Sequence, residues 1–316
     1  MAALDSLRSL SLDGVFIAII AHGLIGVSLV WDKVLLKRPQ TKNLLSYVFW
    51  LGVISIFGLA LIPFGFKLPR AGVALMSFAA GLLDLVASYF YYAALKAGEA
   101  SEELAAMGGF SPVATALLSI PLLKAPVGGQ FVGFAVMTIG GFVMFFAEKR
   151  PLRKMLPKVV IASACFGMTN VLQKIVFNEA NFVTGYVFFT LGTFAGAVAM
   201  LIPRSWRRQI FERSEEATPG SKFWYMVNRL LAGVGSFLVV YAVSRATPAL
   251  IEAISGVRYV IIFIGAYGIT RMRPTWFRED FSRRALVFKA AATCLVIVGL
   301  VIVGLQGGSA GASGTQ

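Results

Sequence analysis

Long apolar runs occupy most of this 316-residue sequence and constrain its fold more than any other feature. A helix needs about 20 mostly apolar residues to cross a bilayer. Ten ranges of the sequence meet that condition: 14–36, 43–64, 71–95, 101–123, 128–147, 158–177, 181–203, 223–245, 248–270 and 285–306. Because backbone polar groups in lipid need internal partners, single runs of this length form helices. The sequence therefore predicts an all-α integral membrane protein with ten transmembrane helices.

The composition supports the same class of protein. Hydrophobic residues make up 58% of the chain and the mean hydropathy is +0.78, whereas soluble domains are about 45–50% apolar. The net charge of +14 would also suit a nucleic-acid-binding protein, but the basic residues lie in short loops between the apolar runs. That placement is typical of the cytoplasmic loops of membrane proteins. We therefore expect a multi-pass membrane protein (in the inner membrane if the source is bacterial) with no nucleic acid partner.

A short joint between two apolar helices occurs twice in the chain. It reads YYAALKAGEASEELAAMGGFSP over 91–112 and YAVSRATPALIEAISG over 241–256. Six positions of the first copy recur at an offset of 149: Tyr92, Ala93, Lys96, Ala97, Ala100 and Glu103 match Tyr241, Ala242, Arg245, Ala246, Ala249 and Glu252. Three earlier positions match at an offset of 141: Gly26, Ser28 and Lys33 match Gly167, Thr169 and Lys174. The common order of these matches indicates an internal duplication.

The duplication divides the chain into two five-helix repeats. We expect the first repeat at 14–147, the second at 158–306, and a linker at 148–157 between them. Since five is odd, the second repeat enters the bilayer from the opposite side, and such inverted repeats commonly build alternating-access transporters. Residues 1–13 are either a short interfacial helix or a frayed terminus. The small, polar tail at 307–316 is expected to be disordered.

These features together resemble a known family. Ten helices in two repeats, with ALKAGEASE at 94–102 and SPVATALL at 111–118, look like the EamA-type branch of the drug/metabolite transporter superfamily. The resemblance covers residues 14–306. It implies secondary active transport of a small organic metabolite by alternating access, as an exporter or exchanger, with proton coupling as one means of driving it. It does not choose a substrate within that class.

Two departures from the family limit what the resemblance implies. The family often ends its fourth and ninth helices with a Leu-Gly-Glu turn, whereas this sequence has Leu123-Lys124-Ala125 and Arg271-Met272-Arg273 there. No role of that glutamate therefore transfers to this chain. The first helix has His22-Gly23 and Trp31-Asp32 in place of a common Trp-Gly pair.

A polar stripe marks the predicted helix 71–95. Asp84 lies near its middle, and Ser88, Tyr91 and Tyr92 follow on the same face. A charge at the centre of a span costs roughly 2.5–3.5 kcal/mol, so Asp84 must meet a cavity or a partner. We expect a functional stripe that faces a cavity. The alternative is a hydrogen-bonded carboxyl that holds this helix to a neighbour.

Arg258 is a second charge within a span, six residues after Glu252 in the predicted helix 248–270. Residues six apart on a continuous helix lie on different faces, so we expect no pair between these two. Arg258 either binds an anionic group of the substrate or is neutralised by Asp84. We expect Asp84 and Arg258 both to reach a central cavity. Three tyrosines are expected to flank that cavity: Tyr91, Tyr92 and Tyr241.

Five polar residues are further candidates for substrate or proton handling. Glu252 and its repeat mate Glu103 begin predicted helices, where the alternative role of a carboxylate is to cap free N–H groups. His22 is the only histidine and is either a proton relay or a packing residue. The corresponding face of the predicted helix 158–177 carries Asn170 and Lys174. Lys174 lies near a helix end, and its alternative role is to extend to the membrane interface.

Enzymatic function is not expected. The sequence has no nucleophile elbow, no phosphate-binding loop and no histidine cluster for a metal, so we predict neither catalysis nor a cofactor. Two alternatives to metabolite transport stay open: a flippase for lipid-linked headgroups and a non-transporting membrane scaffold. The expected partners are a small-molecule substrate and the lipid bilayer, and a homodimer is left open.

Two arguments about orientation conflict. Nineteen Lys and Arg residues lie in the loops after the first, third, fifth, seventh and ninth spans, whereas the other side holds Arg8, Lys67, Arg70, Lys124 and Arg245. An excess of basic residues marks the cytoplasmic side, which places both termini outside. The family resemblance implies cytoplasmic termini instead. We follow the charge count.

Overall fold

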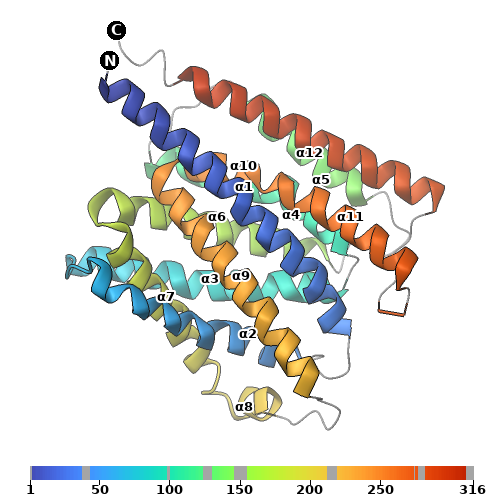
Figure 1. Ribbon diagram of the computed structural model, residues 1–316, viewed down its shortest axis with the longest axis horizontal. Helices are drawn as coiled ribbons and strands as arrows, with labels where there is room; N and C mark the ends of the chain where they lie inside the picture. Colours follow the sequence, from blue (N-terminus) through green and yellow to red (C-terminus); the bar gives the residue numbers. More distant parts are fainter. Residues whose placement is uncertain are drawn as a thin grey trace.

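Helices make up all regular secondary structure in the described part of the computed structural model, which comprises residues 2–37, 43–97, 100–123, 130–145, 155–211, 219–273, 275–276 and 282–310. Figure 1 shows how these helices run side by side. In chain order they are α1 (Ala2–Lys37), α2 (Leu44–Ile54), the 3-10 helix η2 (Ser55–Phe64), α3 (Ala71–Ala97), α4 (Ala100–Leu123), α5 (Gln130–Phe145), α6 (Leu156–Glu179), α7 (Phe182–Ala199), α8 (Arg204–Phe211), α9 (Pro219–Arg245), α10 (Pro248–Ile254), α11 (Gly256–Met272) and α12 (Arg283–Ala310).

Seven helical segments among the described residues are long and apolar enough to cross a membrane. They are Asp13–Leu35, Leu44–Phe64, Ala71–Ala97, Leu156–Glu179, Phe182–Ala199, Phe223–Arg245 and Pro248–Met272. Each coincides with an expected span, and α4, α5 and α12 occupy the remaining expected ranges. The expectation of an all-helical, multi-pass integral membrane protein is therefore confirmed.

The ends of the expected segments differ from the helices in detail. α1 runs without a break from Ala2, so the expected segment 1–13 continues the first span, since no Gly or Pro interrupts that helix there. α12 continues to Ala310, into the tail that was expected to be disordered, and the rest of that tail lies outside the described residues. Most of the expected linker 148–157 also lies outside them.

Two of the spans are not continuous α-helices. In the second span α2 passes into η2, which contains Pro63 and is followed by Gly65 with φ of 111°. In the ninth span Ser255 separates α10 from α11. Ser255 N donates to Glu252 O at 3.0 Å, and Arg258 N donates to Ser255 O at 2.9 Å. Both are i+3 bonds, so the chain is wound locally as a 3-10 helix.

Helices from the two halves of the chain pack against each other. α3 lies against α6 and α7, α1 lies beside α9 and α11, and α5 lies beside α12. α3 and α7 approach closely at two glycines, Gly81 and Gly192, because small residues let helix backbones come together in lipid. The start of α1 and the end of α12 lie at the same end of the molecule, at the upper left of Figure 1.

The other end of the molecule carries Lys96 at the end of α3 and the three arginines of α8, Arg204, Arg207 and Arg208, and is hereafter the basic end. There α1 and α3 end together, since Lys33 Nζ donates to Leu95 O at 2.5 Å. α2 and α9 begin there, where the Tyr225 hydroxyl donates to Tyr47 O at 3.4 Å. The short helix α8, which the sequence analysis did not anticipate, buries Ile210 and exposes its arginines.

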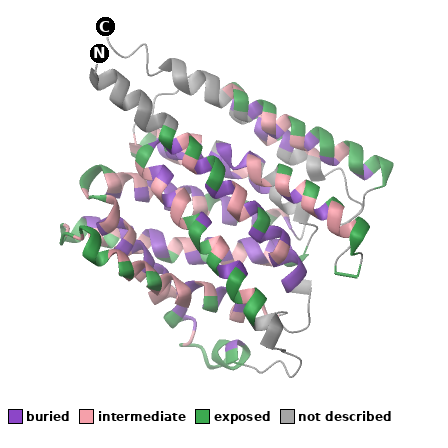
Figure 2. Cartoon of the chain, viewed as in Figure 1, coloured by how far each residue is buried: buried purple, intermediate pink, exposed green. Residues whose placement is uncertain are grey.

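The outer faces of the bundle are apolar although they are exposed. Phe16, Leu75, Ile264 and Val287 each have at least 60% of their surface exposed. Figure 2 shows buried residues on the inward faces of the helices and exposed residues on the outer ones. A soluble monomer rarely exposes this much apolar surface, whereas the acyl chains of a bilayer would cover it.

Candidate functional site

Glu252 lies in α10, just before the break in the ninth span, and its carboxylate is buried. Oε2 accepts a hydrogen bond from the Ser111 hydroxyl of α4 at 2.9 Å. Oε1 accepts one from the Asn170 amide of α6 at 2.6 Å. Two neutral donors from two other helices therefore hold the carboxylate in place, as a buried polar group requires.

Arg258 of α11 reaches the same carboxylate. Its NH2 nitrogen lies 4.0 Å from Glu252 Oε2, so the expectation that these residues point to different faces is wrong. The reason is the break at Ser255, because 3-10 winding has three residues per turn and brings residues six apart onto one face. The Arg258 Nε atom is buried without a hydrogen-bond partner, so the guanidinium keeps a free donor.

His22 of α1 contacts α10 at Ile251, the residue before Glu252. Because Ser255 N donates to Glu252 O, the Ile251 carbonyl is left to accept from His22 Nε2 at 3.0 Å. A carbonyl can only accept, so Nε2 carries the proton and Nδ1 is an acceptor. Nδ1 is buried and has no hydrogen-bond partner.

Four of the residues that the sequence singled out therefore meet at the α10–α11 break: Glu252, Arg258, Asn170 and His22. Ser111 is a fifth member that the sequence analysis did not single out. Its only signal was a hydroxyl beside Pro112 in an apolar helix. These five residues are hereafter the Glu252 cluster. It combines a fixed anion, a cation with a free donor and an imidazole with a free acceptor.

Asp84 lies elsewhere. It is half-buried in α3, the helix that packs on α6 and α7. Among the described residues no hydrogen bond or ion pair joins Asp84 to Arg258. The structure thus places the two expected cavity charges in different surroundings.

The contacts given for the remaining described candidates are with residues outside the Glu252 cluster. Tyr91 packs edge-on against Phe166 of α6, with ring centroids 6.2 Å apart. The Tyr241 hydroxyl accepts a hydrogen bond from Arg245 at 2.6 Å. Lys174 Nζ donates to the carbonyls of Val243 and Ser244, at 3.2 and 3.4 Å, near the end of α9. The side chain of Glu103 lies outside the described residues.

Tyr92 belongs to a second buried cluster that the sequence analysis missed. Its hydroxyl donates to Asp32 Oδ2 of α1 at 3.2 Å and accepts from Arg229 NH1 of α9 at 3.0 Å. The Asp32 carboxylate also accepts hydrogen bonds from Arg229, from the Asn228 amide and from the Tyr47 hydroxyl. We refer to these five residues as the Asp32 network. The sequence feature that could have indicated this network is that Asp32 and Arg229 are charged residues inside apolar runs.

The described part of the chain contains no candidate metal site. No group of three or more His, Cys, Asp and Glu side chains there could hold a metal ion. The two described cysteines, Cys165 and Cys294, are both free thiols.

Comparison with known proteins adds information on the fold. No family model and no curated protein matches this sequence. Twenty-three solved chains match in structure. One of them, a crystal structure of a protein, aligns with a TM-score of 0.60 and 14% identity, over 94% of this chain and 97% of that chain. Identity this low shows a shared fold and no more.

Proposed function

We propose that this protein is a secondary active transporter that moves a small organic metabolite by alternating access. The observation that carries the proposal is a buried carboxylate at the break of a discontinuous span, bonded to helices from both halves of the chain. Transporters typically build substrate and ion sites from such broken helices near the middle of the bilayer. The similarity of the chain to the EamA-type branch of the drug/metabolite transporter superfamily supports the same class.

An architecture of ten helices in two inverted repeats is part of the proposal, and hydrogen bonds support it. The Ser28 hydroxyl of α1 donates to Asn228 O of α9 at 3.4 Å. The aligned Thr169 hydroxyl of α6 donates to Ala80 O of α3 at 3.3 Å. Each bond joins the first helix of one half to the third helix of the other half. The two acceptors, Ala80 and Asn228, are also aligned to within one residue, at the offset of 149 that relates α3 to α9.

A second pair of bonds repeats within each half. Lys33 of α1 donates to Leu95 O of α3, and the aligned Lys174 of α6 donates to Ser244 O of α9. Leu95 and Ser244 are 149 residues apart, the same offset as the duplicated joint. A duplicated five-helix unit accounts for both pairs of bonds.

The free groups of the Glu252 cluster favour a polar solute. The free Nε donor of Arg258 suits an anionic group, because guanidinium binds carboxylate and phosphate strongly. The free Nδ1 acceptor of His22 suits a hydrogen-bond donor of the same solute. We therefore propose a metabolite that carries both an anionic group and a donor group, and that is moved without chemical conversion.

The test begins with the purified protein and a library of metabolites. A solute that binds the folded protein raises its apparent melting temperature, and each such solute is then tested for uptake into proteoliposomes. We expect Glu252→Gln and Arg258→Gln to reduce uptake at least tenfold, which is about 1.4 kcal/mol. The exposed charges Asp13 and Arg204 provide matched controls as Asp13→Asn and Arg204→Gln, which should transport normally.

Two outcomes would oppose this proposal. If no solute stabilises the protein and none is taken up, a membrane scaffold becomes the better description. If solutes are transported equally by Glu252→Gln and by the parent protein, the Glu252 cluster is a structural element and the substrate site lies elsewhere.

A further inference from the structure

Two aligned interfaces between the halves differ in charge. At the α1–α9 interface Asp32 accepts hydrogen bonds from Arg229 and Asn228, which are adjacent in α9. At the α6–α3 interface the aligned residue is Gln173, which donates to the Ser77 hydroxyl at 3.4 Å. Asp32 and Gln173 are 141 residues apart, the offset that also relates Ser28 to Thr169. One interface is therefore ionic, and its counterpart is neutral.

The ionic interface closes the basic end of the bundle. The Arg229 guanidinium lies 4.7 Å from the ring centre of Tyr47 and 5.6 Å from that of Tyr92. Asp32 and Arg229 are both buried, and the Asp32 network joins α1, α2 and α3 of the first half to α9 of the second. Aromatic stacking adds to this contact, since the rings of Trp31 and Trp224 lie 5.6 Å apart.

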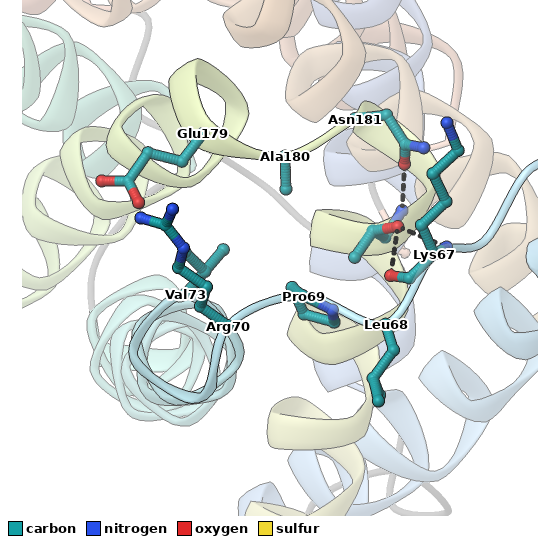
Figure 3. Close-up of a pocket in the computed structure, with 9 residues that line it drawn as sticks. Lys67, Leu68, Pro69, Arg70, Val73, Glu179, Ala180 and Asn181 are labelled. Carbon is teal, nitrogen blue, oxygen red and sulfur yellow. Dashed lines mark hydrogen bonds between the residues drawn. The ribbon is translucent and has the colours of Figure 1, made fainter.

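The neutral interface lies beneath a pocket at the opposite end. This pocket has a volume of about 580 Å³ and is lined by residues 67–70 and 179–181, with Val73 and Thr184. Figure 3 shows Arg70 and Glu179 pointing toward each other across it. Ser77 lies one helical turn inward from Val73 and donates to Gly185 O at 2.6 Å. Val73 and Ser77 are four residues apart on α3, so Val73 lines the pocket and Ser77 lies on the same face one turn deeper.

We infer that the Asp32–Arg229 pair is a latch that holds the transport path shut at the basic end, while the Gln173–Ser77 contact is the weaker gate at the pocket end. The inference rests on the proposed transport function. Separating a buried ion pair leaves two uncompensated charges, whereas separating a neutral amide–hydroxyl pair does not. The resting protein therefore opens more readily at the pocket end, and breaking the latch is the step that opens the basic end.

Thiol labelling measures the two gates without any substrate. In a background of Cys165→Ala and Cys294→Ala, single cysteines are introduced by Ser28→Cys at the latch interface and by Thr169→Cys at the aligned neutral interface. Both parent residues are buried. We expect a water-soluble maleimide to label the Thr169→Cys protein at least tenfold faster than the Ser28→Cys protein. Equal or reversed rates would overturn the assignment of the stronger gate.

Removing the two charges of the latch is the second part of the labelling experiment. Asp32→Asn combined with Arg229→Gln should speed labelling of the Ser28→Cys protein at least tenfold and leave labelling of the Thr169→Cys protein slower or unchanged. The charge-swapped pair, Asp32→Arg with Arg229→Asp, should restore slow labelling, because the two buried charges again compensate each other. Neutralising exposed charges at the other end, with Arg70→Gln and Glu179→Gln, should have no effect on the latch.

The outcomes separate this inference from the proposed function. If the protein with Asp32→Asn and Arg229→Gln folds and its Ser28→Cys thiol is still labelled slowly, the Asp32–Arg229 pair is not a latch. This conclusion holds whatever the uptake assay shows. If the neutralised protein does not fold, the charge-swapped protein decides. Fast labelling of a folded charge-swapped protein would overturn the latch, and slow labelling would support it. If the labelling rates are as expected but no solute is taken up, the result opposes transport. It still supports the difference in strength between the two interfaces.

Discussion

Gly81 of α3 and Gly192 of α7 each face the backbone of the other's helix. A Cβ atom on Gly81 would lie 2.0 Å from Phe189 O, and one on Gly192 would lie 2.0 Å from Phe78 O. Backbone atoms cannot move aside as a flexible side chain can. The two glycines therefore set how closely α3 and α7 approach, and α3 in turn carries Ser77, the hydroxyl of the neutral gate.

A methyl group at either glycine should separate these helices. We expect Gly81→Ala and Gly192→Ala each to destabilise the protein by about 1–3 kcal/mol or more, because overpacking forces the backbone to shift. The measurement is the apparent melting temperature in detergent. Gly233→Ala is the matched control, since nothing lies within 4 Å of that position in α9. It should stabilise by about 0.5–1 kcal/mol, because alanine is the better helix former. Equal effects at all three sites would contradict the close approach.

The two aligned lysines should contribute to stability despite their charge. Lys33 and Lys174 each donate to carbonyls near the end of a helix, and a hydrogen bond to a charged group contributes about 1.5–3 kcal/mol. We expect Lys33→Met and Lys174→Met to lower the melting temperature, with the larger effect at Lys33, which is fully buried. Lys67→Met serves as the control, because the Lys67 side chain is exposed. A lysine that only extended to the membrane interface would behave as Lys67 does.

The positions of the helices follow from the sequence because length and hydropathy decide them. Every expected span coincides with a helix, and seven segments meet the length and hydropathy for a membrane crossing. A change from α-helical to 3-10 winding within a span cannot be predicted from length and hydropathy. The pairing of Glu252 with Arg258 depends on the i+3 bonds at Ser255. The one Pro of this span, Pro248, stands at its start, so no Pro beside Ser255 signals that break beforehand.

Contacts between distant spans were also beyond the reach of the sequence. Asp32 and Arg229 are 197 residues apart, and their meeting depends on how α1 packs on α9. A helix that is apolar all round does not show which face meets a neighbour. The sequence therefore does not indicate which polar residue of one span contacts which polar residue of another. Aligning the repeats did relate Ser28 to Thr169 and Lys33 to Lys174, and these pairs make equivalent bonds.

His22 should act mainly through its hydrogen bond to the Ile251 carbonyl. Glutamine has an Nε2 donor of similar reach, whereas leucine has none. We expect His22→Leu to destabilise the protein by about 1–3 kcal/mol, the cost of an unsatisfied buried polar group, and His22→Gln to lose less than half of that. Thermal unfolding of the two variants measures the difference. If His22 binds solute through Nδ1 as well, His22→Gln should also weaken the stabilisation by any solute found in the library.

The orientation of the chain should follow its charge. Nineteen Lys and Arg residues lie in the loops of one side and five on the other, and the basic side of a membrane protein faces the cytoplasm. The end of α12 lies opposite the basic end (Figure 1), so a reporter fused to the C-terminus should be outside. We expect a reporter enzyme that works only in the cytoplasm to be inactive there, and one that works only outside to be active. Fusion after Ala97, at the end of α3, should give the reverse result. Cytoplasmic activity of the C-terminal fusion would show that the termini lie inside, as the family resemblance implies, and would place the Asp32–Arg229 latch at the outer face.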